Sequence, residues 1–434
     1  MVSLGNLVEH QKGYAFPSKE YTDEGRPVVR VSDFTSDSVN HKTEKAIQES
    51  LADTFSRFML KHGDIVIATV GSWGTNPNSV VGKTVRIPEE VDGALLNQNA
   101  VRLRAKNPLS QEFLYYSLRS NCFSKYIVGT AQGSANQASI TLQDIFNFEI
   151  LDCSPKEHYA RSRILSRIDR KIELNRKTNE TLEGIAKALF KSWFVDFDPV
   201  RARAEGRPTG LPNETSELFP DSFEESELGE IPSGWRFGDL NDLANLNPES
   251  WSAKNHPSEL IYVDLSGTKN GTIEETVAYE WSDAPSRARR VLKEGDTIVG
   301  TVRPGNRTFS LIQRVGLTGS TGFAVIRPKQ SFNASFLYVA STSDESIDRL
   351  AHLADGGAYP AVRPDVVMET PINIPSEPVQ MLFGELTDSL FRKISVNEQE
   401  TVVLGQLRDA LLPRLISGEL RVPDAEKLLE EAGV

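Results

Sequence analysis

The chain carries the same order of short motifs twice, about 220–230 residues apart. Four pairs of segments show the repeat: 4–7 (LGNL) and 237–240 (FGDL), 61–66 (KHGDIV) and 293–298 (KEGDTI), 113–115 and 336–338 (both FLY), and 170–172 and 392–394 (both RKI). Solenoid repeats have periods of about 20–50 residues, so this spacing indicates a duplicated domain. We therefore expect two similar modules, an arrangement that suits a target with two halves.

The composition is that of an ordinary globular protein. Of the 434 residues, 39% are hydrophobic and 25% are charged, which suits two to four domains with full cores. Cys122 and Cys153 are the only cysteines, so we expect no disulfide framework and a reducing, cytoplasmic location. The N-terminal segment does not have the pattern of a signal peptide, and no run of about 18 apolar residues occurs. A soluble protein is expected.

The net charge of −12 argues against nucleic-acid binding at first sight, because such proteins usually have a basic face. The acidic residues are concentrated in two places, however. Residues 213–230 hold seven carboxylates and no basic residue, and residues 424–434 carry a net charge of −3. The rest of the chain therefore has a net charge of −2, so net charge alone excludes neither nucleic acid nor protein as the partner.

The expected fold class is α/β (α+β), with two pseudo-symmetric globular domains separated by two long antiparallel coiled-coil helices. Local patterns predict strands at 64–70, 80–81, 101–103, 297–302 and 322–326, and a short helix at 113–118. The expected order is a module at 1–155, a helix at 156–195, an extended acidic linker at 196–230, a module at 231–375, a helix at 376–422 and an acidic tail at 423–434.

Two helical segments repeat a seam of residues at alternating steps of three and four, as coiled coils do. Each helix of about 35 residues would be roughly 50 Å long. The expected seam and partner-docking positions are Leu165, Ile168, Ile172, Asn175, Leu182, Leu189, Trp193, Leu390, Ile394, Asn397, Leu404, Leu411 and Leu415. Neither seam is apolar enough to stand alone, so we expect the two helices to pack on each other.

Asn175 and Asn397 occupy the same seam position in the two copies. A buried Asn in such a seam lowers stability but fixes register and partner. One or both side chains could instead rotate to solvent, because polar seam positions are common in short antiparallel pairs. The sequence leaves these two alternatives open.

No catalytic motif is complete. Residues 82–84 (GKT) resemble the end of a phosphate-binding loop, but Pro77 stands where the first glycine belongs and would remove an N–H from the loop. The chain has no Pro-Pro pair, which the [DNS]PP[YF] loop of a base methyltransferase needs. Its three Pro-Asp pairs lack the Glu-x-Lys of a nuclease, and its six histidines lack metal-ligand spacing. We expect no catalytic, cofactor or metal site in this chain.

The loops after the repeated strands are the candidate recognition surfaces. Loops 71–78 and 303–308 follow equivalent strands, and loops 132–137 and 355–360 lie later at matching places. Asn and Gln can bind adenine edges and Arg can bind guanine, although turns favour many of the same residues. Because the loops match in place but differ in residues, they would suit two different recognition surfaces. With the basic run at 286–290, the candidate DNA-binding residues are Ser72, Trp73, Asn76, Asn78, Asn136, Gln137, Arg287, Arg289, Arg290, Arg303, Asn306, Arg307 and Tyr359.

Three long segments make the chain resemble the specificity subunit of type I restriction–modification systems over essentially its full length. Residues 171–200 (KIELNRKTNETLEGIAKALFKSWFVDFDPV) are similar to the family's central conserved segment. Residues 229–235 (GEIPSGW) are similar to the start of a target recognition domain, and residues 411–420 (LLPRLISGEL) to the end of the distal conserved helix. The first module lacks its own Ile-Pro-x-Gly-Trp start, so we expect its N-terminal edge to be shorter.

The resemblance implies a non-catalytic subunit that recognises DNA. Each target recognition domain would read one half of a bipartite double-stranded site, while the helices would set the gap and dock two methyltransferase subunits. Adenine-N6 methylation with S-adenosylmethionine, and restriction with ATP and Mg, would belong to the methyltransferase and restriction subunits. The alternative is an adaptor whose two modules bind proteins. A self-sufficient restriction–methylation enzyme would need catalytic loops that the sequence lacks.

Overall fold

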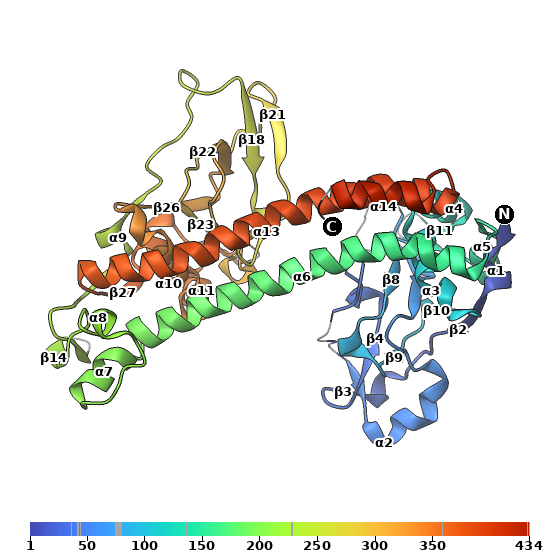
Figure 1. Cartoon of the computed structure of the whole chain (residues 1–434), viewed down its shortest axis with the longest axis horizontal. Coiled ribbons are helices and arrows are strands. Elements are labelled where there is room, and N and C mark those ends of the chain that lie inside the picture. The colour runs from blue at the N-terminus through green and yellow to red at the C-terminus, as the bar shows by residue number, and fades with distance from the viewer. Residues whose placement is uncertain are drawn as a thin grey trace. The chain divides into compact units, whose positions relative to one another are not determined.

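The computed structural model describes residues 1–35, 37–40, 43, 45–73, 80–134, 137–226, 229–357, 359–431 and 433. Its contacts divide the chain into unit 1, which comprises Met1–Leu174 and Glu400–Val434, and unit 2, which comprises Asn175–Gln399. Each unit contains a globular module and part of both long helices, α6 (Pro155–Phe194) and α13 (Glu377–Ser417). The mixture of strands and helices confirms the expected α/β class (Figure 1).

Unit 1 is built around an antiparallel sheet with the strand order β2–β10–β6–β8. These strands are β2 (Val8–Lys12), β10 (Ala100–Ala105), β6 (Ile65–Ala68) and β8 (Thr84–Arg86). All four residues of β6 are buried, which explains its uniformly apolar sequence. The helices α3 (Gln111–Arg119) and α4 (Asn121–Thr130) follow β10 and contribute Phe113 and Phe123 to the same core. The side chain of Ser120 caps α4 by accepting a hydrogen bond from the Phe123 N–H at 3.2 Å.

Smaller elements complete unit 1. A second sheet has the order β3–β5–β4–β9, and a two-stranded sheet joins the N-terminus to the segment before α6. The remaining elements are β1 (Val2–Ser3), α1 (Leu4–Leu7), β3 (Tyr21–Thr22), β4 (Arg26–Val29), β5 (Ala46–Ile47), α2 (Glu49–Ala52), β7 (Val70–Gly71), β9 (Leu95–Leu96), β11 (Gln132–Ser134), β12 (Gln137–Ser139), α5 (Leu142–Phe146) and β13 (Glu149–Ile150).

Unit 2 repeats the main sheet with the order β17–β26–β23–β24. These strands are β17 (Ala244–Leu246), β26 (Phe323–Pro328), β23 (Thr297–Gly300) and β24 (Phe309–Leu311). The helices α10 (Ala334–Thr342) and α11 (Asp344–Leu353) follow β26, as α3 and α4 follow β10 in unit 1. Ser343 caps α11 at Ser346 with the same 3.2 Å geometry as the cap of α4. The duplication in the sequence is therefore a duplication of fold.

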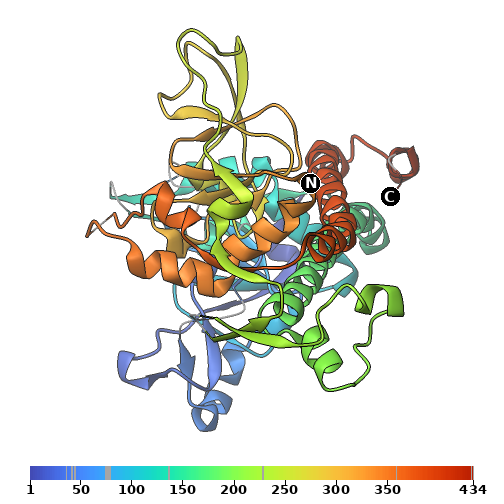
Figure 2. The ribbon, with the colours of Figure 1, turned by 90° about the vertical axis from the view of Figure 1, so that its left-hand side faces the viewer.

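A second sheet of unit 2 has the order β21–β18–β25–β22, and in both views its strands β18 and β21 project from the rest of the unit (Figures 1 and 2). The remaining elements of the module are β16 (Arg236–Asp239), α9 (Leu240–Leu243), β18 (Glu259–Val263), β19 (Thr268–Lys269), β20 (Thr272–Ile273), β21 (Val277–Glu280), β22 (Ala288–Val291), β25 (Leu317–Ser320), α12 (Pro364–Met368) and β27 (Pro371–Ile374).

The repeated Lys-x-Gly-Asp motif forms the turn that starts the central strand of each main sheet. Gly63 and Gly295 have φ values of +82° and +86°, in the left-handed region that favours glycine. The following aspartate closes the turn by accepting a hydrogen bond from the lysine N–H, at 2.7 Å in unit 1 and 2.8 Å in unit 2. The motif is therefore conserved between the copies for its turn geometry.

Two details of the expected repeat need correction. Leu4 and Leu240 each begin the short helix that follows the first strand of their module, and both are fully buried. In the structure, Leu4 therefore corresponds to Leu240. The alignment of 4–7 with 237–240 paired Leu4 with Phe237, three residues earlier. The strand expected at 80–81 is also wrong, because Val80 forms only an isolated bridge to Ser72 and the strand itself begins at Thr84.

The helices contact their modules as well as each other. In unit 1, Leu165, Ile168, Ile172, Leu404, Leu411 and Leu415 lie in one hydrophobic core with Leu4 and Phe113. In unit 2, Trp193 is buried in the core that contains Phe336, and Leu189, Leu390 and Ile394 pack against that core while half-buried. Leu182 is half-buried. The seams are therefore weakly apolar by coiled-coil standards because the modules supply the rest of each core.

The segment expected to be an extended linker is folded. It contains α7 (Asp198–Ala204), α8 (Asn213–Ser216) and the hairpin of β14 (Phe223–Ser226) and β15 (Gly229–Pro232). Val200 is fully buried, and the Phe219 ring packs edge-on against Trp193 at 4.9 Å between centroids. The expectation was wrong because a few apolar residues, placed among many acidic ones, supply enough burial to fix the segment on unit 2.

The expected acidic tail contains an amphipathic helix, α14 (Val422–Glu431). Ala425 and Leu429 are buried in the core of unit 1, and the acidic side chains occupy other faces of the helix. None of the helices in the described part of the chain combines the length and the apolar character that a membrane crossing requires.

Candidate nucleic-acid interface

The candidate loops, which lie far apart in the sequence, are joined in pairs by the same backbone bond in both units. In unit 1, the N–H of Ile140 donates to the carbonyl of Thr69 at 3.0 Å, and β12 pairs with β7. In unit 2, the N–H of Val362 donates to the carbonyl of Thr301 at 2.9 Å, next to a bridge between Val302 and Ala361. The loop after the central strand is thus held against the later loop in each copy.

In unit 1, this surface is made of polar and aromatic side chains. Ser72 bridges to Val80, and Trp73 is half-buried with its Nε1–H donating to the Ser134 carbonyl at 2.7 Å. This bond gives Trp73 a structural role between the two loops. Gln137 is exposed on β12. Three further candidates, Asn76, Asn78 and Asn136, lie outside the described residues.

In unit 2, the equivalent loop is a single 3-10 turn, Pro304–Asn306, flanked by two arginines. Arg303 and Arg307 have φ values of +48° and +59°, although left-handed backbone costs a residue with a Cβ about 1–2 kcal/mol. The guanidinium carbon of Arg303 lies 4.6 Å from the centre of the Tyr359 ring, which is 70% exposed. Arg307 forms an ion pair with Asp344 at the start of α11.

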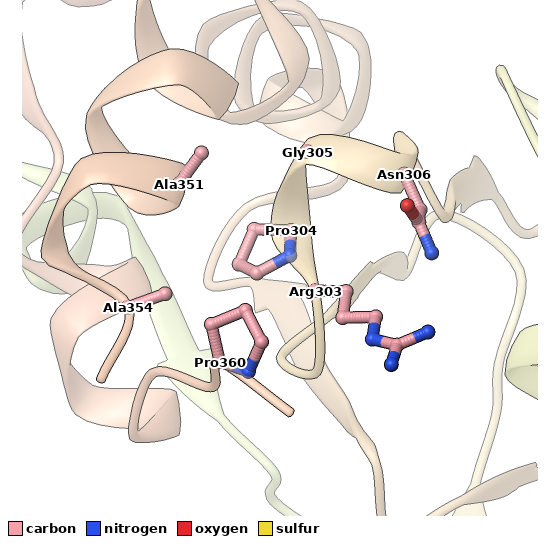
Figure 3. Close-up of a pocket in the computed structure, with 7 residues that line it drawn as sticks. All are labelled: Arg303, Pro304, Gly305, Asn306, Ala351, Ala354 and Pro360. Carbon is pink, nitrogen blue, oxygen red and sulfur yellow. The ribbon is translucent and has the colours of Figure 1, made fainter. Parts of the chain in front are cut away.

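An open pocket of about 330 Å³ lies behind this turn (Figure 3). Ala351, Ala354, Pro304 and Pro360 give it apolar walls. In the close-up, the side chains of Arg303 and Asn306 extend from the turn on the side away from the two alanines. The turn therefore presents its polar groups outward from an apolar base.

The arginines of the run at 286–290 are held by neighbouring groups of unit 2. Arg287 pairs with Asp264 at 3.1 Å, and Arg290 donates to the Ser250 hydroxyl at 3.3 Å. Burial lowers the pKa of the Arg290 guanidinium. Arg289 lies 4.4 Å over the Trp281 ring, whose other neighbour, His256, is stacked at 4.0 Å. The stacked His256 and Trp281 were not predicted from the sequence, because they lie 25 residues apart in a loop-rich region.

The backbone connects this run to the turn. The N–H of Thr321 donates to the carbonyl of Arg287 at 2.8 Å, and the N–H of Thr301 donates to the carbonyl of Gly322 at 2.9 Å. Thr301 lies two residues before Arg303. The structure therefore brings the candidate residues of unit 2 into one connected set of loops.

Both seam asparagines are buried, at 4% exposure for Asn175 and 1% for Asn397. The Nδ2 of Asn397 donates to the side-chain oxygen of Asn179 at 2.8 Å, and the Nδ2 of Asn175 donates to the Asn397 carbonyl at 3.4 Å. Of the two alternatives that the sequence left open, the structure has the buried one, since each amide finds a partner on the opposite helix.

A cluster that the sequence did not indicate lies beside these asparagines in unit 2. The Tyr338 hydroxyl donates to Glu183 Oε1 at 3.1 Å, and Lys187 pairs with the same oxygen at 2.8 Å. Burial raises the pKa of Glu398 to about 7, a hydrogen bond from Thr272 opposes the rise, and the negative charge of Glu183 adds to it. The only sequence signal was the repeated FLY motif, which places Tyr338 on α10.

Among the residues that the structure describes, no group of three or more His, Cys, Asp or Glu side chains is placed to hold a metal ion. The surfaces described above are instead built from arginines, amides, aromatic rings and tightly turned backbone. Such groups bind nucleic acids by hydrogen bonding, stacking and charge.

Comparison with known proteins shows what the chain is similar to. The family model of the type I restriction modification DNA specificity domain matches residues 1–184. The chain is 27% identical over 340 residues to the specificity subunit of the type I restriction enzyme MjaIX from Methanocaldococcus jannaschii, covering 76% of this chain and 73% of that relative. It is 24% identical over 413 residues to the specificity subunit of the type I restriction enzyme HindI from Haemophilus influenzae, covering 83% and 87%.

The fold agrees with this family. The crystal structure of a type I restriction–modification system S subunit from M. genitalium matches with a TM-score of 0.56 over 95% of both chains, at 16% identity. The resemblance to type I specificity subunits is thereby confirmed, and DNA recognition is the function that this family relationship supports.

Proposed function

We propose that the chain reads a bipartite double-stranded DNA site, with one half-site bound by each unit. The observation that carries this proposal is the shared pairing of the candidate loops, through Thr69 and Ile140 in unit 1 and through Thr301 and Val362 in unit 2. The scaffold is repeated, while the exposed side chains differ: Gln137 in one copy, and Arg303, Asn306 and Tyr359 in the other. Two copies of one frame with different contact groups would recognise two different sequences.

We further propose that α6 and α13 set the gap between the half-sites and dock two methyltransferase subunits, with restriction subunits joining through them in the cytoplasm. The buried amide contacts of Asn175 and Asn397 would fix the register of the two helices. Methyl transfer to adenine N6 with S-adenosylmethionine, and cleavage with ATP and Mg, would be the chemistry of those partners. This chain would contribute sequence choice alone.

The charge of the chain has a consequence for its affinity. DNA binding gains much of its strength from cations that neutralise phosphates. A net charge of −12 makes that contribution small for this chain, and two candidate arginines of unit 2, Arg287 and Arg307, are already paired with Asp264 and Asp344. We therefore expect weak DNA binding by the chain alone and tight binding when a methyltransferase partner supplies phosphate contacts.

Two measurements test the proposed function. A duplex containing the site is titrated with the chain, with and without the methyltransferase partner, and the partner should increase the affinity strongly; equal affinities would contradict the proposed division of labour. Replacement of residues 1–155 by the same module of a relative should change one half of the methylated site in cells. A change in both halves would contradict separate reading. A complex that protects no DNA sequence would favour the protein-binding adaptor.

A further inference from the structure

The turn Pro304–Asn306 of unit 2 is directly preceded by Arg303, whose backbone is left-handed. We propose that Arg303 recognises a guanine in the half-site bound by unit 2, and that Asn306 contacts the neighbouring base pair. This inference rests on the proposed function, because it names residues and a base within the DNA interface proposed above. It narrows the broad set of candidate loops to one turn. It also predicts that the half-site bound by unit 2 contains a guanine.

The backbone of the turn is fixed at both ends. The Arg303 N–H donates to the carbonyl of Pro360 at 2.7 Å, and the Arg307 carbonyl accepts from the Asn270 N–H at 2.9 Å. Inside the turn, the Asn306 N–H donates to the Arg303 carbonyl at 2.8 Å. A turn held in this way presents its side chains from a defined position, which base recognition requires.

The backbone is also strained where the reading group stands. Glycine or asparagine would occupy a φ of +48° at lower energy than arginine does. Non-glycine residues in this region concentrate at functional sites, where the surrounding structure maintains them. An arginine here therefore points to a use of its side chain, because turn formation alone would favour another residue.

Tyr359 orients the guanidinium of Arg303. The contact places the guanidinium carbon 4.6 Å from the ring centre, and the ring is largely exposed. A guanidinium that stacks on an aromatic ring is restricted to a plane, with its N–H groups pointing along that plane. Guanine presents O6 and N7 in the major groove as two adjacent acceptors, which a planar guanidinium binds at two points.

Asn306 and Arg307 have separate parts in this arrangement. Asn306 is exposed, and its amide extends on the same side of the turn as the Arg303 side chain (Figure 3). Arg307 is tied to Asp344 on α11, so it acts as a positioning residue for the turn. The two residues that reach outward together are thus Arg303 and Asn306.

The experiment maps adenine methylation in the DNA of cells that carry the full complex, with the native chain, Arg303→Gly or Asn306→Ala. The native site should contain a guanine in the half that exchange of residues 231–375 alters. Arg303→Gly should relax the requirement for guanine at that position. The preference for guanine over other bases should fall roughly 5- to 150-fold, the range for loss of a bidentate contact. Asn306→Ala should relax the adjacent position. Glycine suits the positive φ, so Arg303→Gly should keep the thermal stability of the native chain.

Two further variants make the result specific. Arg363→Ala removes an equally charged, exposed arginine that pairs with Asp365, and should leave the methylated sequence unchanged. Tyr359→Ala should weaken the guanine preference, and Tyr359→Phe should restore it because the stacking ring is retained.

The possible failures are distinguishable. If Arg303→Gly lowers methylation equally at all sequences, Arg303 binds phosphate and the inference is overturned. A site without guanine in that half overturns it as well, although bipartite reading stands. If the native complex methylates no bipartite site, the proposed function itself fails.

Discussion

The carboxylate of Asp296 is bound at two points by the guanidinium of Arg327, with both N–O distances at 2.8 Å. Asp64 and Arg104 make the same contact in unit 1, at 2.5 and 2.7 Å. Each aspartate directly precedes a central strand of its sheet, β23 or β6, and each arginine lies on the neighbouring strand, β26 or β10. The duplicated fold therefore contains a duplicated ion pair that ties a tight turn to a strand.

Removal of the buried partner should be costly in unit 2. Asp296 is fully buried, so Asp296→Ala leaves the Arg327 guanidinium without its main counter-ion and opens the Lys293 turn. We expect a loss of about 3–5 kcal/mol in the free energy of unfolding, measured by urea denaturation. The matched control, Asp365→Ala, removes an exposed carboxylate and should cost under about 1 kcal/mol. Equal effects of the two substitutions would contradict this role.

The buried amide network should contribute measurably to stability. Asn397→Ala removes the donor to the Asn179 side chain and leaves that half-buried oxygen unsatisfied. The expected loss is about 1–3 kcal/mol in the free energy of unfolding. Val396, the preceding residue, is 55% exposed, and Val396→Ala should change stability by about 0.5 kcal/mol or less. An Asn397→Ala variant as stable as the native chain would show that the network has no net effect.

The folded state of residues 196–232 should depend on Phe219. This ring is 1% exposed. Phe219→Ala should lower the free energy of unfolding by about 3–5 kcal/mol, because it removes buried apolar surface and leaves a cavity. The adjacent Leu218 is 38% exposed and provides the control. Limited proteolysis should cleave the Phe219→Ala variant rapidly between residues 205 and 218, while Leu218→Ala remains resistant. Resistance of both variants would mean that the segment is held by other contacts.

The stability of unit 2 should depend on pH through Glu398. Burial raises its pKa to about 7, whereas the same group in the unfolded chain titrates near its ordinary value of 4.5. The folded state thus holds this proton over a range in which the unfolded state has released it, so the contribution to stability falls as pH rises from about 4.5 to 7.

Substitution of Glu398 tests this dependence. The glutamine side chain of the Glu398→Gln variant cannot ionise. As pH rises from 4.5 to 8, the free energy of unfolding of this variant should increase relative to that of the native chain by on the order of 1–3 kcal/mol. The groups that interact with Glu398 include Glu183, Thr272, Arg314 and Tyr338. Thermal unfolding of the native chain and of the Glu398→Gln variant, measured across this pH range, gives the difference in stability at each pH. Parallel pH profiles would show that Glu398 titrates normally in the folded state.

Local patterns in the sequence were sufficient for several elements. The buried strand β6, the helix α3 and the two long helices follow from local residue patterns, which depend on near neighbours alone. The extended linker was predicted wrongly for the same reason. Its composition is dominated by carboxylates, and the burial of Val200 and Phe219 depends on a surface formed by distant residues such as Trp193.

The candidate surface was predictable only in outline. The sequence placed recognition in loops after equivalent strands, but the same residues are those that turns use. It could not show that Arg303 stacks on Tyr359, because the two are 56 residues apart. Nor could it show that Arg287 and Arg307 are paired with Asp264 and Asp344. Such contacts depend on side-chain positions that local pattern does not encode.

The sequence by itself determined the duplication, the two long helices and the resemblance to type I specificity subunits, because repeated motifs and seam periodicity are written along the chain. Only the tertiary structure decided that Asn175 and Asn397 are buried, that the presumed linker and tail are folded, and that the turn after β23 carries strained arginines. The physical reason is that burial and pairing are set by the groups that meet in space. In this chain those groups are often more than 100 residues apart, as Asn175 and Asn397 are.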